Sequence, residues 1–181
     1  MGFPSFVILD QDGEMLAKVE ARSVEGFEKA LAAAQELHAL DLAGKGGDAA
    51  AAKTVLLKRI GWQAMPLAAA TEQLAKFELS DAERVATTGA LLGIELAEAR
   101  LCEDKAEGLK RLLRILDEGR LVDEPTVSGT FWRYLAVGAE QQKDAAAFAR
   151  YVEYLKAQVA KNPRMQGQLD AAEKKLAAMK Q

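Results

Sequence analysis

Residues 5–19 read Ser-Phe-Val-Ile-Leu-Asp-Gln-Asp-Gly-Glu-Met-Leu-Ala-Lys-Val and predict a β-hairpin near the start of the chain. The run from Ser5 to Leu9 is apolar at consecutive positions and rich in β-branched and aromatic side chains, which is typical of a strand buried on both faces. The run from Asp10 to Gly13 supplies turn chemistry, because glycine adopts a positive φ angle without strain. The run from Met15 to Val19 is then the returning strand.

A helix is expected directly after the hairpin. Ser23 is a suitable N-cap, and Glu25 places a negative charge near the positive end of the helix dipole. Apolar residues recur on one face of this helix, namely Phe27, Ala30, Leu31, Ala34 and Leu37.

The rest of the chain is rich in alanine and shows helical periodicity without a further strand candidate. Three glycines between residues 44 and 47 interrupt the pattern, so we expect a hairpin-and-helix segment at 1–43 and a helical domain at 44–181. Capping and stop signals in the helical domain predict helices at 48–60, from 66, from 81, at 105–118, at 127–141, at 144–160 and from 162 onward.

The strongest of these start signals is the capping box Ser80-Asp81-Ala82-Glu83, in which a serine and a glutamate satisfy each other's backbone amides. In the helix that it opens, Gly89 and Gly93 lie one turn apart and predict the close approach of a neighbouring helix. The last helix carries an apolar stripe that either caps the preceding helices or forms half of an intermolecular contact: Met165, Leu169, Ala172, Leu176 and Met179.

These patterns predict a mainly α protein, with an N-terminal β-hairpin plus helix followed by antiparallel helical hairpins in a short solenoid or bundle. The segment from Trp132 to Pro163 resembles a tetratricopeptide unit, with an aromatic start, small and apolar residues, a Lys143-Asp144 turn and a closing Asn-Pro. Its later aromatic spacing departs from that consensus. We therefore expect helical hairpins that are like repeats, without assigning the segment to the family.

The segment Gly2-Phe3-Pro4-Ser5-Phe6-Val7-Ile8-Leu9-Asp10, followed by Asp12-Gly13-Glu14, resembles the C-terminal half of thioredoxin-like proteins. Those proteins commonly show a Gly-x-Pro-Thr/Ser-Phe strand, an Asp-x-Asp-Gly turn, a return strand and a final helix, which match residues 2–38 here. The resemblance implies that Pro4 occupies the cis-proline position that lies against the active-site disulfide. The chain is also similar to bacterial proteins in which a thioredoxin-like domain is followed by an alanine-rich helical region.

The chain departs from that family in its redox chemistry. The family's Cys-x-x-Cys turn would precede Met1, and Cys102 is the single cysteine of the sequence. Because dithiol exchange needs two thiols, we expect the chain to be incapable of it alone. It is either the downstream part of a longer thiol-disulfide oxidoreductase or a remnant that has kept the hairpin for structure.

The predicted hairpin is too small to be stable by itself, and its apolar first strand would have a bare edge. Something should therefore cover that strand. We expect two chains to pair their hairpins into a shared sheet as a homodimer, through Ser5, Phe6, Val7, Ile8 and Leu9.

Composition argues against two classes of partner. The net charge is −3 and the basic residues are scattered, so nucleic acid is not expected as a partner. No apolar run reaches the roughly 20 residues needed to cross a bilayer, so membrane insertion is not expected either. The compartment is left open: cytoplasmic if the chain is complete, or exported if it is a fragment.

The sequence shows no catalytic constellation and predicts neither a metal nor a cofactor. His38 is the single histidine, and Glu36 and Asp41 beside it do not make a set of three or four convergent ligands. Binding of a small ligand between helix pairs would need an apolar cavity with a few inward polar groups, and the sequence reveals no such set.

The function that we expect from the sequence is non-catalytic protein interaction. The alternative is the C-terminal portion of a thiol-disulfide oxidoreductase whose Cys-x-x-Cys half is absent from this chain. The candidate interaction residues outside the hairpin are Trp62, Trp132, Met165, Leu169, Leu176 and Met179.

Overall fold

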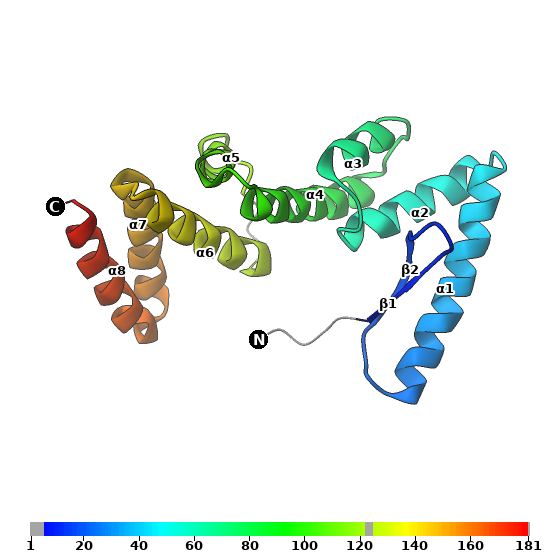
Figure 1. The fold of residues 1–181 in the computed structure, drawn as a ribbon, viewed down its shortest axis with the longest axis horizontal. Coiled ribbons are helices and arrows are strands. Elements are labelled where there is room, and N and C mark those ends of the chain that lie inside the picture. The colour runs from blue at the N-terminus through cyan, green and yellow to red at the C-terminus, as the bar shows by residue number, and fades with distance from the viewer. Residues whose placement is uncertain (1–5, 122–124, 181) are drawn as a thin grey trace. The chain divides into compact units, whose positions relative to one another are not determined.

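The computed structural model describes residues 6–121 and 125–180, so Pro4 and Ser5 lie outside the part that it describes. The chain is mainly helical, with a small two-stranded antiparallel sheet near its N-terminus (Figure 1). Packing divides it into two compact units, Met1–Leu91 and Leu92–Gln181, and the division falls within helix α4 (Asp81–Leu101). The boundary that the sequence analysis expects between residues 43 and 44 rested on composition and stays a prediction.

The sheet consists of β1 (Phe6–Leu9) and β2 (Met15–Val19), at the positions that the sequence predicts. Asp10 forms the turn, since its Oδ1 accepts the amides of Asp12 at 2.9 Å and Glu14 at 2.8 Å. Across the two strands Phe6 lies opposite Val19, Val7 opposite Lys18, Ile8 opposite Ala17 and Leu9 opposite Met15, with a register shift between Ile8 and Leu9.

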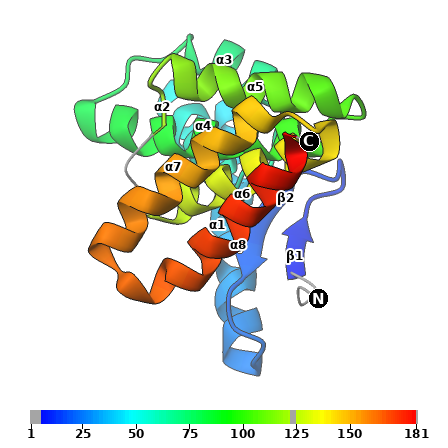
Figure 2. The ribbon, with the colours of Figure 1, turned by 90° about the vertical axis from the view of Figure 1, so that its left-hand side faces the viewer.

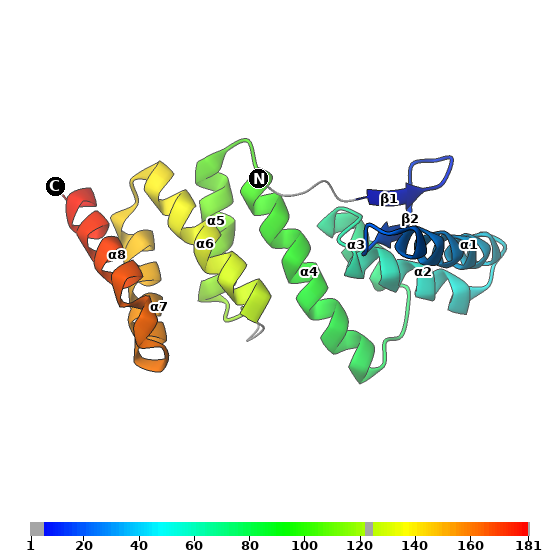
Figure 3. The same ribbon diagram turned by 90° about the horizontal axis from the view of Figure 1, so that it is seen from below.

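Helix α1 (Val24–Lys45) packs on the hairpin and begins where the sequence predicts, because the Ser23 side chain accepts the amide of Gly26 at 3.1 Å. Strand β2 lies closer to α1 than β1 does (Figure 3). As a result, β2 and not β1 supplies the buried strand residues of the small core under the sheet, which consists of Leu16, Ala17, Ala30 and Ala34.

Helices α2 (Ala49–Gly61) and α3 (Leu67–Leu74) continue the N-terminal unit, with α2 packed on α1 and α3 on α2. The first two helices meet closely, because a Cβ atom added to Gly44 would lie 2.9 Å from the Cα of Ala52. The glycines after residue 43 therefore form a tight corner between helices that pack against each other.

A buried carboxylate joins three elements of this unit. Asp41 of α1 is only 6% exposed, and the Lys45 ammonium lies 2.7 Å from its Oδ2. Arg59 of α2 places Nη2 3.4 Å from Asp41 Oδ1 and Nη1 3.6 Å from Glu14 Oε2 in the hairpin. Because a buried carboxylate is costly without cations beside it, this cluster fixes the hairpin, α1 and α2 in one arrangement.

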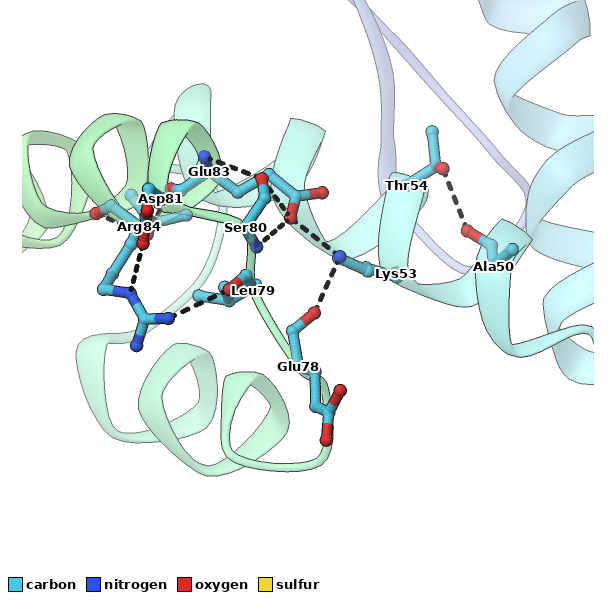
Figure 4. A network of polar contacts seen from close by, with 10 residues as sticks. Ala50, Lys53, Thr54, Glu78, Leu79, Ser80, Asp81, Glu83 and Arg84 are labelled. Atoms are coloured by element: carbon cyan, nitrogen blue, oxygen red, sulfur yellow. Dashed lines mark hydrogen bonds and ion pairs between the residues drawn. The ribbon is translucent and has the colours of Figure 1, made fainter.

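The predicted capping box at the start of α4 is present and is anchored to α2 (Figure 4). Ser80 Oγ accepts the Glu83 amide at 3.3 Å, and Glu83 Oε2 accepts the Ser80 amide at 2.7 Å. Lys53 Nζ donates to the same Oε2 at 2.8 Å and to the Glu78 carbonyl at 2.8 Å. The hydrogen bond from Lys53, followed by those from Ser80, lowers the pKa of Glu83 to about 2.

The described residues of the C-terminal unit form the second half of α4 and four further α-helices. These are α5 (Lys105–Asp117), α6 (Pro125–Gln142), α7 (Ala145–Lys161) and α8 (Gln166–Met179), with a 3-10 helix (Pro163–Met165) before the last. From α5 onward each α-helix packs on the next, and Figure 2 shows α7 and α8 side by side. The largest fully buried side chains of this unit are Phe131, Phe148, Leu96, Ile115, Leu135, Leu155 and Val152.

Helices α4 and α5 approach closely at Gly108, a glycine that the sequence does not single out. A Cβ atom added to Gly108 would lie 2.4 Å from the carbonyl oxygen of Ala99, so α5 lies almost against the backbone of α4. At Gly89, where the sequence predicts a close approach, nothing lies within 4 Å of an added Cβ atom.

Candidate interaction surface

Most of the exposed large apolar residues of the N-terminal unit lie on β1 and on the first turns of α1. Phe6, Val7 and Leu9 are 44%, 40% and 49% exposed. The prediction of a strand buried on both faces is wrong for these residues, because α1 packs mainly on β2 and leaves β1 exposed. The exposed residues of this region, together with half-buried Ile8, are called the β1 surface below: Phe6, Val7, Ile8, Leu9, Val24, Phe27 and Leu31.

Within the β1 surface, an aromatic contact joins β1 to α1, and a groove lies beside it. The Phe6 and Phe27 rings pack edge to face, with centroids 5.6 Å apart, and the Arg22 guanidinium lies 5.6 Å from the Phe6 ring centroid. Beside them Ile8, Phe27 and Leu31 line an open groove of about 510 Å³. The groove therefore has an apolar wall on the strand and another on the helix.

One edge of β1 is open. Within residues 6–121 and 125–180, β1 pairs only with β2, so the backbone groups on its other edge belong to no ladder. Charged residues or prolines commonly protect such edges from pairing, and residues 6–9 contain neither. Within the described residues, this edge of β1 is therefore neither paired nor protected by charge.

The β1 surface is a sizeable apolar patch. Its side chains leave on the order of 500 Å² of apolar surface exposed, which lies in the upper part of the range for the largest patch on a monomer and below the roughly 800 Å² that each partner contributes to a standard interface. The helix residues of this surface form a stripe of their own, at 24, 27 and 31, adjacent to the buried stripe at 30, 34 and 37. The sequence prediction places residues of both stripes on one helical face. The spacing of 24, 27 and 31, distinct from that of 30, 34 and 37, was the signal that could have separated them.

The two tryptophans belong to different units and are each half-buried. Trp62 follows α2, and its carbonyl oxygen accepts a hydrogen bond from Lys18 Nζ at 2.9 Å. Trp132 stacks on Tyr154 of α7, with ring centroids 4.5 Å apart and an angle of 13° between the planes. Each tryptophan therefore has a contact inside its own unit, and neither lies on the β1 surface.

The apolar stripe of α8 faces the preceding helices. Leu169 and Ala172 are each 7% exposed and belong to the core of the C-terminal unit. Met165, Leu176 and Met179 are half-buried and pack against the same core. Of the two roles that the sequence left open for this stripe, capping of the preceding helices is the one seen in the chain.

The residues that carry possible chemistry are dispersed. His38 is exposed and Cys102 is half-buried. In the described part of the chain, no three side chains of His, Cys, Asp or Glu are grouped so that they could hold a metal ion. Likewise, none of the described helices is both long and apolar enough to span a bilayer.

Comparison with known proteins adds no relative: no family model, no curated protein and no solved structure matches this chain. The β1 surface is therefore the candidate site, and the function must be argued from its geometry.

Proposed function

We propose that this chain is a non-catalytic protein interaction module that self-associates through β1. The observation that supports this is the open edge of β1, with apolar side chains exposed on both faces of the strand and an apolar groove beside it. Edge strands of this kind pair readily with another strand.

A second copy of the chain is the occupant that fits best. Two β1 strands that pair antiparallel about a two-fold axis would form a four-stranded sheet, in which each contact occurs twice. Because residues 6–9 carry no charge, this pairing brings no like charges together. The stripe of Val24, Phe27 and Leu31 gives the incoming strand an apolar surface to lie on.

In this proposal the hairpin and α1 are a partial thioredoxin-like fold, and the helices after them form a short array of helical hairpins. The order hairpin, turn and helix at residues 6–45 supports the first assignment. The packing of successive helices from α5 to α8 supports the second. The array would leave further surface for other protein partners.

The substitution Val7→Lys tests the proposal, because a lysine on an edge strand opposes pairing. Sedimentation velocity at rising micromolar concentration should show the mass of the wild-type chain increasing from 19.5 kDa toward twice that value. Val7→Lys should stay at 19.5 kDa. Val85→Lys is the matched control, because Val85 is 76% exposed on α4 and should tolerate the charge without loss of the dimer. A wild-type chain that remains a monomer throughout would refute self-association.

The same open edge favours a second candidate function. The strands that precede the cis-proline in thioredoxin-like proteins would cover this edge, so the chain could be the C-terminal portion of a thiol-disulfide oxidoreductase. Genomic DNA upstream of the codon for Met1 distinguishes the two candidates. An in-frame Cys-x-x-Cys motif there would favour the oxidoreductase, and a stop codon directly upstream would contradict it.

A further inference from the structure

The C-terminal unit contains a hollow that does not belong to the β1 surface. It has a volume of about 360 Å³ and lies between the end of α4, the start of α5 and the middle of α6. Ala99, Leu109 and Leu112 form a floor of buried apolar side chains, and Val137, 48% exposed, adds apolar wall. A hollow of this volume is in the lower part of the range for small-molecule sites.

Three positive side chains line this hollow. The guanidinium groups of Arg100 and Arg133 lie 5.4 Å and 5.3 Å from the centroid of the same ring, that of Tyr134. Lys105 donates from Nζ to the carbonyl oxygens of Arg100 at 3.3 Å and Cys102 at 2.7 Å. No aspartate or glutamate is among the described residues that line the hollow, and none of the described ion pairs includes these three cations.

This arrangement concentrates positive charge in a chain whose net charge is −3. Two guanidinium groups near one tyrosine ring repel each other, and an anion that contacts both would relieve that repulsion. Arginine suits this role because its planar donors match the two oxygens of a carboxylate.

The backbone amides at the start of α5 do not provide a competing anion site. Asp104 Oδ1 already accepts the amides of Ala106 at 2.9 Å and Glu107 at 3.2 Å. Binding of an anion in the hollow would therefore depend on side chains, namely the three cations and the buried apolar residues of the floor. A ligand that uses both features needs a negative group attached to a hydrocarbon body.

We propose that this hollow binds a small organic carboxylate with an apolar body. The carboxylate lies between Arg100 and Arg133, and the body lies on Leu109, Leu112 and Val137. This inference goes beyond protein interaction through β1 and rests on different residues, so either proposal can fail without the other.

Hexanoate is a suitable probe, with hexanamide as its uncharged counterpart. Titration of the ¹⁵N-labelled chain, followed by amide chemical shifts, should place hexanoate at residues that line the hollow, including Leu109 and Gly138. Because the guanidinium groups recognise charge, hexanamide should bind about tenfold more weakly or less.

The double variant Arg100→Gln/Arg133→Gln should weaken hexanoate binding by about tenfold or more, since it removes both charge-assisted contacts. Arg114→Gln is the control, because Arg114 is an exposed arginine of α5 that does not line the hollow. It should bind hexanoate as the wild type does. Equal binding of hexanoate and hexanamide, unchanged affinity in the double variant, shifts confined to the β1 surface or no shifts at millimolar probe would each overturn the proposal.

Discussion

Replacing Gly108 by alanine tests how closely α5 packs on the end of α4. The added Cβ atom would lie 2.4 Å from the Ala99 carbonyl oxygen and 3.5 Å from the Cys102 Cβ atom. The first contact is far inside van der Waals distance, and its partner is backbone within a helix. The substitution must therefore move one helix relative to the other.

Two effects of opposite sign determine how far Gly108→Ala changes the free energy of unfolding. Alanine favours a helix interior over glycine by roughly 1 kcal/mol, which stabilises the variant. Overpacking against an atom that cannot rotate away costs about 1–3 kcal/mol and sometimes more. With a contact this short we expect the overpacking to prevail, with a net loss of about 2 kcal/mol in the free energy of unfolding. For a unit of this size that loss lowers the Tm by on the order of 10 °C.

Thermal and urea unfolding, followed by tryptophan fluorescence, measure this loss of stability in the C-terminal unit. In a Trp62→Phe background the remaining indole, Trp132, reports on residues 92–181 through its stack on Tyr154. Gly129→Ala is the matched control, because an added Cβ atom there meets nothing within 4 Å and alanine should stabilise α6. If Gly108→Ala is as stable as Gly129→Ala, the close packing of α5 on α4 is refuted.

Two further predictions concern the polar contacts of the N-terminal unit. Asp41→Asn should lower the free energy of unfolding by about 3 kcal/mol in urea titrations that follow Trp62, because it removes the buried partner of Arg59 and leaves this largely buried arginine only the half-exposed Glu14. The exposed pair of Glu25 and Lys29 offers a control, since Glu25→Gln should cost under about 0.5 kcal/mol. Equal effects of the two substitutions would contradict the role of the buried cluster. Glu83→Gln should be less stable than the wild type above pH 4.5, and the difference should vanish as the pH falls from 4.5 to about 2. The reason is that the pKa of Glu83 is lowered in the folded state, so protonation removes the stability that the charged carboxylate contributes. A difference in stability that stays constant across acid unfolding curves would contradict this reasoning.

The features that the sequence predicts well are those decided by neighbouring residues. The turn at Asp10 to Gly13 and the capping box at Ser80 each depend on side chains within four positions of the backbone that they bind. The ends of most helices follow for the same reason, because caps and stops act locally.

The features that the sequence misses depend on distant partners. Whether β1 is buried depends on how many strands the sheet contains and on where α1 crosses it, which the apolar run alone cannot reveal. Asp41 was considered only as a neighbour of His38, because its partner Arg59 lies on another helix. The cations of the hollow escaped notice since Arg100, Lys105 and Arg133 converge only when α4, α5 and α6 pack together.

The pairing of β1 with a second β1 can be observed directly by isotope-filtered NOE spectroscopy on a mixture of ¹³C-labelled and unlabelled chains, at a concentration where the dimer should form. We expect NOEs between chains that connect the methyl groups of Val7, Ile8 and Leu9 in one copy with residues 6–9 of the other. Spectra without NOEs between chains, or with such NOEs only from residues outside the β1 surface, would contradict the proposed self-association.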